Sequence, residues 1–259
     1  ISGLLFALPL LTEDSIIKII PPFESKSYID LTIDMLKKFG IEVLFLDDLT
    51  LTIKGNQKYI ATDYKVEGDF SQLGFFAVLG AINNDLTCEG LDINSKQGDR
   101  EIIEILKNCG IKIEELENGY KIFRGLPKAY NINLENCPDL GPILTVLSAY
   151  GDGEFKIYNA QRLRYKESDR IEAMENELKK LGVQISSDES NIYIKGNSKY
   201  ISCNEVFGHK DHRIVMSLAI FATLLDSPLI IEGAEAISKS YPNFFEDLKN
   251  LNIKIEITD

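Results

Sequence analysis

The chain has 259 residues, of which 44% are hydrophobic and 26% are charged, the proportions of a globular protein with a sizeable core. Its formal net charge of −12 argues against nucleic acid or an anionic membrane as a partner, although a small anion can still bind in a locally positive cleft. No stretch of about 18 apolar residues occurs, so the sequence predicts no membrane-spanning helix.

The predicted elements follow one order: an apolar helix, a short strand, an amphipathic helix and two more strands. Helical spacing or strict alternation of apolar residues marks each of them. In the first part of the chain we expect them at residues 3–11, 15–20, 28–39, 41–45 and 51–54. The order recurs at residues 71–83, 86–91, 99–109, 111–115 and 119–123, and again at 140–150, 153–159, 169–181, 183–186 and 191–195. A fourth copy occupies residues 211–225, 227–233, 243–251 and 253–257.

These four copies predict a repeated α/β (α+β) architecture. Further strands are expected ahead of the second and third copies, at residues 64–67 and 130–133, so the complete unit is βαβαββ. Each second helix is followed by a residue type that tolerates the left-handed conformation of a helix C-cap: Gly40, Gly110, Gly182 and Asn252. The alternative is an ordinary α/β chain whose parts resemble one another by chance.

Charged residues gather in the loops ahead of the helices. Helix N-termini have unpaired N–H groups and a partial positive charge, so they attract anions and phosphate groups. If the repeats pack around an axis with their helices parallel, one face collects these termini together with Lys166, Arg170, Arg213 and Lys239. The sequence therefore predicts an anion-binding face on a protein of negative net charge.

The same residues also have a purely structural interpretation. Asp139, Ser168 and Asp169 can each cap the helix that follows them. The charged run 164–170 can be a solvated loop that is paired within itself, and Lys239 can be an ordinary surface lysine. The recurrence of charged sets at equivalent places in the repeat favours the binding site.

The four cysteines, Cys88, Cys109, Cys137 and Cys203, are scattered and include no CxxC pair. Reduced thiols of a cytoplasmic protein are the expected state in a chain of this length. There are only two histidines and neither has zinc-ligand spacing from a cysteine, so we expect no metal site and interpret His212 as a structural residue at a helix start.

Several segments carry a resemblance to a known family. Residues 164–171, Arg-Tyr-Lys-Glu-Ser-Asp-Arg-Ile, resemble the Lys-Glu-Ser/Thr-Asp-Arg signature of the EPSP synthases, which are enolpyruvyl transferases. The other matching segments are Ser-x-x-Tyr-x-x-x-Thr at 25–32, Glu-Gly-Asp-x-Ser at 67–71, Asn-Cys-Pro-Asp at 136–139, Asp-His-Arg at 211–213 and Lys-Ser-Tyr-Pro at 239–242. They occur in the family's order along essentially the whole chain.

The resemblance implies the fold of the enolpyruvyl transferases, an inside-out barrel type with six repeats in two globular halves. The sequence then begins within the third repeat, so residues 1–65 would be a remnant of the N-terminal half and residues 66–259 would form the C-terminal half. Family segments that lie upstream and grip both substrates have no counterpart here. We therefore expect an incomplete chain, inactive alone, whose partner is the missing N-terminal part of the same enzyme.

A reaction is implied as well: the enolpyruvyl group of phosphoenolpyruvate moves to the 5-hydroxyl of shikimate 3-phosphate and phosphate is released, without a metal or an organic cofactor. By position, Asp139 would take the hydroxyl proton, and Glu167 would protonate the methylene carbon and later remove that proton. Lys166 would bind substrate at the reacting centre, where it exchanges a proton or steadies the leaving phosphate. A carboxylate at a helix N-terminus normally has a low pKa, so Asp139 needs desolvation or the substrate itself to act as a base.

Three cations would clamp the phosphate and carboxylate of phosphoenolpyruvate: Arg170, Arg213 and Lys239. Arginine suits this role because its planar fork pairs bidentately with such oxyanions. Ser25 and Tyr28, in the other half, would contact shikimate 3-phosphate.

Two rival functions remain at this point. The related transferase that acts on UDP-N-acetylglucosamine shares the fold but lacks the Lys-Glu-Ser-Asp-Arg block of residues 166–170 as written here. A non-catalytic module that only folds or binds ligand is the second rival, and the retained set of charged residues argues against it.

Overall fold

The computed structural model describes residues 1–23, 26–201, 203 and 205–258. The chain divides into two compact units: residues 1–68 with 94–98 form unit 1, and residues 69–93 with 99–259 form unit 2. The first 68 residues thus separate close to the boundary expected after residue 65, and the short loop 94–98 packs with them. That the units belong to the two halves of a larger enzyme stays a prediction.

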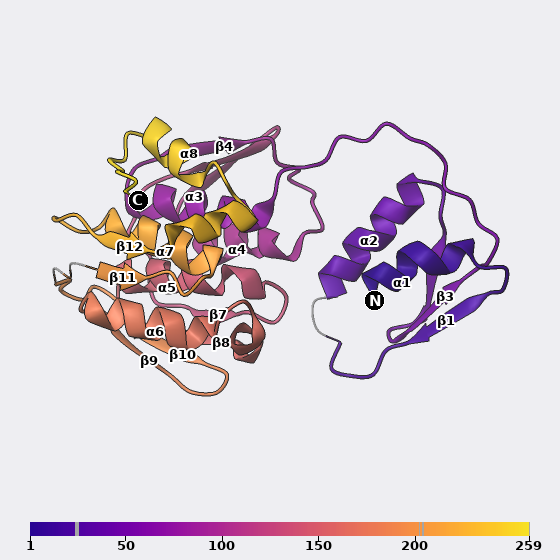
Figure 1. The fold of residues 1–259 in the computed structure, drawn as a ribbon, viewed down its shortest axis with the longest axis horizontal. Coiled ribbons are helices and arrows are strands. Elements are labelled where there is room, and N and C mark those ends of the chain that lie inside the picture. Colours follow the sequence, from indigo (N-terminus) through magenta and orange to yellow (C-terminus); the bar gives the residue numbers. More distant parts are fainter. Residues whose placement is uncertain (24–25, 202, 204, 259) are drawn as a thin grey trace. The chain divides into compact units, whose positions relative to one another are not determined.

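Unit 1 consists of a three-stranded antiparallel sheet and two helices (Figure 1). Its elements are α1 (Ser2–Ala7), η1 (Leu8–Leu10), β1 (Ser15–Lys18), α2 (Lys26–Lys38), β2 (Val43–Asp47) and β3 (Thr50–Ile53), with strand order β1-β3-β2. Leu5 of α1 and Leu36 of α2 pack with Ile53 in a small core. Leu4 and Phe6 of α1 remain exposed.

Unit 2 contains three successive copies of the repeat. The first comprises α3 (Phe70–Ile82), β4 (Leu86–Glu89), η2 (Gly98–Arg100), α4 (Glu101–Asn108), β5 (Ile113–Leu116) and β6 (Gly119–Ile122). The second comprises β7 (Asn131–Asn133), η3 (Pro138–Leu140), α5 (Gly141–Tyr150), β8 (Glu154–Tyr158), η4 (Gln161–Tyr165), α6 (Arg170–Lys180), β9 (Gln184–Ser187) and β10 (Ile192–Lys195). The third comprises β11 (Glu205–Phe207), α7 (His212–Ala222), β12 (Ile230–Glu232), η5 (Ala234–Lys239) and α8 (Phe244–Asn250).

Each copy builds a small sheet of its own. The strand orders are β4-β6-β5, β7-β8-β10-β9 and β11-β12. The register places Ile194 opposite both Phe155 and Ile185, so apolar side chains of neighbouring strands share one buried face. Strands β7 and β11 pair in parallel with β8 and β12, and the other pairs in unit 2 are antiparallel. Among the described residues the sheets stay separate and do not join into a closed barrel.

The first helices of the three copies, α3, α5 and α7, contact one another in the middle of unit 2. Figure 1 shows them between β4 and the sheet that contains β9 and β10. They are apolar on all sides, and in α5 every residue from Gly141 to Ala149 is buried. Because these helices fill the core, the polar residues at their N-termini are brought close together.

The predicted helix ends are confirmed by the backbone. Gly40, Gly110, Gly182 and Asn252, which follow α2, α4, α6 and α8, have φ angles of 79°, 82°, 83° and 65°. These are left-handed values, which glycine and asparagine adopt most readily. All four cysteines are free thiols, as expected.

Two predicted strands are wrong. Residues 64–67 and 253–257 belong to no strand, although apolar residues alternate with polar ones in both. Neither segment has a partner strand to pair with, and Val66 and Ile257 are 79% and 66% exposed. Conversely, strand β11 was not expected; it forms because residues 205–207 lie beside β12.

Candidate active site

The residues predicted to bind an anion lie at the start of three helices of unit 2. Asp139 belongs to the short helix η3 directly before α5, Lys166 and Glu167 lie in the loop before α6, and Arg213 lies at the start of α7. Lys239 ends η5. These helices pack against one another in the core, so six predicted residues meet at their N-termini: Asp139, Lys166, Glu167, Arg170, Arg213 and Lys239.

Hydrogen bonds at the helix N-termini show which of the aspartates there act as helix caps. Asp169 caps α6, since its Oδ1 accepts a hydrogen bond of 3.0 Å from the Glu172 N–H. Asp211 caps α7 in the same way, at 2.9 Å from the Arg213 nitrogen. The residue directly before α5 is Leu140, which makes no side-chain cap hydrogen bond. The Asp139 carboxylate forms ion pairs with Lys166, Arg170 and Arg213.

Arg170 connects these elements through its buried guanidinium. Its Nε and Nη2 atoms lie 2.8 and 3.2 Å from the two oxygens of Asp211. Nη1 lies 3.0 Å from Asp139 Oδ1, and Nη2 also lies 2.7 Å from Glu167 Oε2. The side chain is only 1% exposed, and these carboxylates compensate for the loss of hydration.

Asp139 is surrounded by cations. Its Oδ1 also lies 3.1 Å from Lys166 Nζ, and Arg213 Nη2 lies 3.6 Å from Oδ2. Arg213 Nη1 in addition donates a hydrogen bond of 3.2 Å to the Asp139 carbonyl oxygen. Burial raises the pKa of Asp139, but the charges of Arg213, Lys166 and Arg170 outweigh burial and lower that pKa to about 2. Asp139 is thus ionised at neutral pH.

Glu167 is held between two cations, Arg170 and Lys239. The Lys239 ammonium forms a close ion pair with Glu167 Oε1 while Arg170 binds Oε2. Burial raises the pKa of Glu167, yet the Lys239 hydrogen bond and the Arg170 charge lower it to about 2. Lys239 is thus paired, although more than half of its side chain is exposed, and the two predicted acid–base residues share Arg170 as a neighbour.

A further carboxylate, Asp99, was not assigned a role from the sequence. It lies in η2 before α4, is 2% exposed, and accepts a hydrogen bond from the Ser71 hydroxyl through Oδ2. Its Oδ1 has no hydrogen-bond partner among the described residues. The pKa of Asp99 is raised to about 6, because burial and, to a smaller extent, the nearby charge of Asp139 outweigh the lowering effect of the Ser71 hydrogen bond. Its position before a helix was the only signal in the sequence.

The two remaining predicted substrate contacts are Ser25 and Tyr28. Ser25 lies outside the described residues. Tyr28 lies in α2 of unit 1, where its side chain is partly exposed. His212 is buried at the start of α7, as expected, but its Nδ1 has no hydrogen-bond partner among the described residues, so it is not the fully satisfied structural histidine that the sequence suggests.

The described part of the chain contains neither a metal site nor a membrane-spanning helix. Across residues 1–23, 26–201, 203 and 205–258, no group of His, Cys, Asp and Glu side chains has the arrangement of a metal site. No helix in these ranges is long and apolar enough to cross a bilayer.

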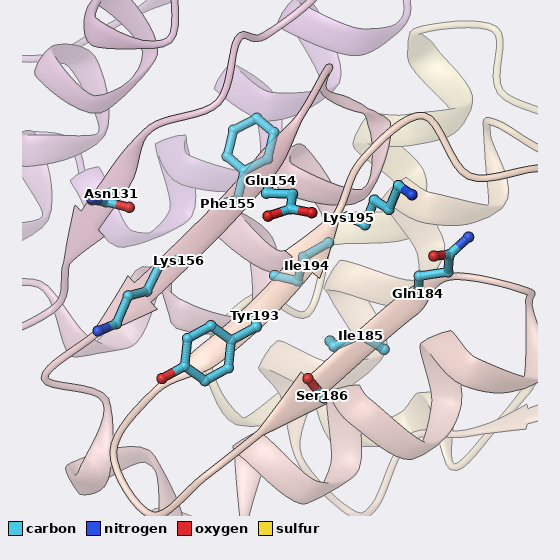
Figure 2. Close-up of a pocket in the computed structure, with 10 residues that line it drawn as sticks. All are labelled: Asn131, Glu154, Phe155, Lys156, Gln184, Ile185, Ser186, Tyr193, Ile194 and Lys195. Atoms are coloured by element: carbon cyan, nitrogen blue, oxygen red, sulfur yellow. The ribbon is translucent and has the colours of Figure 1, made fainter.

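An open pocket of about 530 Å³, whose lining includes no member of the charged cluster, lies on the exposed face of the sheet of β7, β8, β10 and β9 (Figure 2). Its side chains come from neighbouring strands, and Lys156 lies over the Tyr193 ring at 5.7 Å from the centroid. The lining residues are Asn131, Glu154, Lys156, Gln184, Ser186, Tyr193 and Lys195, together with Phe155, Ile185 and Ile194, whose side chains are buried. None of them is a predicted site residue, and we assign this pocket no function.

Comparison with known proteins identifies the family. The model of the family described as EPSP synthase (3-phosphoshikimate 1-carboxyvinyltransferase) matches residues 1–248. The chain belongs to the EPSP synthase family. Proteins named 3-phosphoshikimate 1-carboxyvinyltransferase from Clostridium kluyveri and Clostridioides difficile are 46% and 45% identical to it, each over 99% of this chain and over 60% and 59% of their own length. The chain thus spans about 60% of the length of these EPSP synthase relatives.

Solved structures agree with this assignment. An EPSP synthase from Acinetobacter baumannii superposes with a TM-score of 0.84 and 27% identity, over 99% of this chain and 61% of that one. The enolpyruvyl transferase NikO from Streptomyces tendae superposes with a TM-score of 0.79, over 99% of this chain and 60% of that one, but at 16% identity, so this second likeness concerns the fold alone. The predicted enolpyruvyl transferase fold, built from repeated α/β units, is therefore confirmed.

Proposed function

We propose that this chain carries the acid–base residues and the phosphoenolpyruvate site of a cytoplasmic EPSP synthase. The reaction would transfer the enolpyruvyl group of phosphoenolpyruvate to the 5-hydroxyl of shikimate 3-phosphate and release phosphate. One observation carries the proposal: Lys166, Arg170, Arg213 and Lys239 converge on Asp139 and Glu167 at buried helix N-termini.

The cations differ in how readily they can turn to a ligand. Arg170 makes four N–H···O contacts with carboxylates, so it mainly fixes the geometry of the site. Lys166, Arg213 and Lys239 make fewer contacts, and Lys239 is the most exposed of them. We therefore assign these three the direct contacts to the phosphate and carboxylate of phosphoenolpyruvate, supported by the positive ends of the helix dipoles.

Anion binding would also prepare the two carboxylates for proton transfer. With a pKa of about 2, Asp139 is a weak base and Glu167 is no acid at neutral pH. The cations that hold both pKa values down are the ones that a bound phosphate or carboxylate would attract. As the ligand takes over Arg213 and Lys239, both pKa values rise. Asp139 then becomes a better base for the 5-hydroxyl, and Glu167 can carry a proton to the methylene carbon.

The second substrate needs further residues. Ser25 and Tyr28 stay our proposed contacts to shikimate 3-phosphate, on the resemblance of residues 25–32 to the family's motif. Because the two substrates must meet before transfer, we expect turnover in a protein of the relatives' full length rather than in residues 1–259 alone.

Calorimetric titration of this chain with phosphoenolpyruvate tests the proposal. We expect binding that weakens as salt rises, because the contacts are ionic, and that is lost on Arg213→Ala. The matched control is Arg124→Ala, since Arg124 is exposed and takes no part in the ion pairs of the cluster described above. Absence of heat from the unaltered chain, or equal heat from both variants, would contradict the assignment of the phosphoenolpyruvate site to this cluster.

A further inference from the structure

The loop that leads into α7 has an unfavourable backbone conformation. His209 and Lys210 have φ angles of 52° and 55°, so two consecutive residues other than glycine are left-handed. The left-handed region brings the Cβ atom too close to the backbone, and lysine, unlike histidine, is not enriched there. Such a conformation persists only where surrounding contacts enforce it.

Contacts on both sides of this loop enforce it. Glu177 of α6 is 2% exposed, and its Oε1 lies 2.9 Å from His209 Nε2. Its Oε2 accepts a hydrogen bond of 3.0 Å from the Phe207 N–H and one of 2.7 Å from Lys180 Nζ. Burial raises the pKa of Glu177, but Lys180, His209 and Phe207 lower it overall, so the carboxylate is ionised and His209 Nε2 is the donor. One buried carboxylate thus binds the chain before and within the strained segment.

Gly208 holds the backbone of the loop in place through two hydrogen bonds and close packing. Its N–H donates to the Glu232 carbonyl oxygen at 2.8 Å, and its own carbonyl accepts from the Asp211 N–H at 2.9 Å. A Cβ atom at this position would lie 2.4 Å from Val215 and 2.8 Å from the Glu232 oxygen. The backbone therefore lies tightly against β12 and α7, and residues 209 and 210 must complete the turn.

The turn directly precedes two residues of the candidate site, Asp211 and Arg213, and determines where they lie. Directly after it, Asp211 caps α7 by accepting from the Arg213 N–H, and its carboxylate also binds Arg170. The Arg213 guanidinium reaches Asp139. The height and direction of α7's first turn, and hence the place of Arg213, follow from the conformation of residues 208–210.

We propose that Glu177 and His209 are positioning residues: their hydrogen bond holds the left-handed turn that directs Arg213 toward Asp139. Neither side chain is a member of the charged cluster; they contact each other instead. For its ligand the proposal rests on the proposed function, since the anion that Arg213 would bind is phosphoenolpyruvate. A purely structural alternative is that Glu177 only joins α6 to β11.

Two substitutions at one position separate these readings. His209→Ala and His209→Gly both remove the imidazole, but only glycine adopts the left-handed conformation without penalty. In the 259-residue chain we expect His209→Ala to raise the dissociation constant for phosphoenolpyruvate about tenfold. The reason is that the free-energy penalty of a left-handed alanine reduces the fraction of molecules in which the turn is formed by about this factor. His209→Gly should raise it less than about threefold, because glycine adopts the left-handed conformation without the hydrogen bond that histidine needs to hold it. Equal losses in both variants, or no loss in either, would overturn the proposal.

A second readout does not depend on the ligand. Amide hydrogen exchange at Arg213 reports whether the α7 cap is formed, because this N–H donates to Asp211 Oδ1. We expect faster exchange in His209→Ala and in Glu177→Gln, and exchange close to that of the unaltered chain in His209→Gly. If the exchange difference appears while no form of the chain binds phosphoenolpyruvate, the proposed function fails and the positioning role stands. If exchange is unchanged in all three variants, the positioning role fails whatever the chain binds.

Discussion

Arg170 and Asp211 form a two-point ion pair inside unit 2, with Nε 2.8 Å from Oδ2 and Nη2 3.2 Å from Oδ1. The side chains are 1% and 0% exposed. Arg170 begins α6 and Asp211 caps α7, so the pair joins the starts of two helices. The loop that carries Lys166 and the first turn of α7, which carries Arg213, are thereby fixed before any ligand binds, which lowers the ordering cost of binding.

Removing the guanidinium should destabilise unit 2 strongly. Arg170→Met leaves Asp211 buried without its cation, and breaking a buried pair in this way costs about 3–5 kcal/mol. Urea denaturation followed by circular dichroism gives the free energy of unfolding. The control is Lys249→Met, whose exposed pair with Glu246 contributes about 0–1 kcal/mol. Similar losses in the two variants would show that the Arg170–Asp211 pair is not a structural anchor.

Asp139→Asn should separate binding from catalysis. The amide keeps the shape but carries no charge, so Lys166 and Arg213 become freer for an anion, and phosphoenolpyruvate should bind the chain several-fold more tightly. In a full-length enzyme the same change should slow phosphate release by about 10²–10⁴-fold, the usual loss of a general base. Asp152→Asn, at an exposed position, should change neither quantity. Unimpaired turnover in Asp139→Asn would remove the base role from Asp139.

Asp99→Asn should stabilise the chain at neutral pH and not in acid. The pKa of Asp99 is raised from 3.8 to about 6, so folding favours its protonated form. The protonated Asp99 carboxyl therefore contributes to the free energy of unfolding fully below about pH 3.8. This stabilisation is lost as the pH rises through about 6, where the buried carboxylate must ionise. The asparagine keeps an acceptor for Ser71 and never ionises. We expect a gain of up to about 3 kcal/mol at about pH 7.5 that disappears near pH 4, measured by thermal unfolding at both pH values. A gain that is equal at the two pH values would contradict the raised pKa.

Lys239→Met should raise the pKa of Glu167. Burial raises this pKa and the Lys239 hydrogen bond is the largest influence that lowers it, so without the ammonium the balance shifts upward from about 2. Titration of the Glu167 carboxyl carbon by NMR follows this directly. Lys249→Met serves again as the control. An unmoved Glu167 titration would show that Lys239 does not hold the carboxylate in solution.

Gly110→Ala and Gly3→Ala should have opposite effects. At both positions an added Cβ meets no atom within 4 Å, so the backbone conformation alone decides the outcome. Gly110 has a φ of 82°, and alanine there costs about 1–2 kcal/mol. Gly3 lies within α1, where alanine gains about 0.5–1 kcal/mol over glycine. Thermal unfolding of the two variants should shift in opposite directions, and a destabilised Gly3→Ala would contradict the helical conformation at residue 3.

Helices, their ends and most strands could be predicted because their signals are local. The apolar run of α5 and the glycine after α4 lie within a few residues of the element that they define. The errors at residues 64–67 and 253–257 arise because a strand forms only beside a partner strand. The alternation of apolar and polar residues does not reveal whether such a partner exists.

The charged cluster could be predicted only through the repeat and the family motif. Its members lie as far apart in the chain as Asp139 and Arg213, and no spacing reveals that they meet. Glu177 and His209 escaped notice for the same reason: their hydrogen bond spans the chain from α6 to the loop before α7. Asp99 looked like any polar residue before a helix, because burial is a property of the folded core and not of the local sequence.

The route of the chain between its units determines how the protein can be cut. Residues 94–98 belong to unit 1 while their neighbours on both sides belong to unit 2, so the covalent chain passes between the units three times. Proteolysis after residue 68 would leave this short loop attached to the larger fragment, where Lys96 would lose Asp34 and Gln97 would lose the Gly68 carbonyl. A fragment that begins at residue 69 therefore contains residues 94–98, directly before Asp99, without the residues of unit 1 that they contact. A fragment that ends at residue 68 lacks residues 94–98, so it is not a complete unit 1.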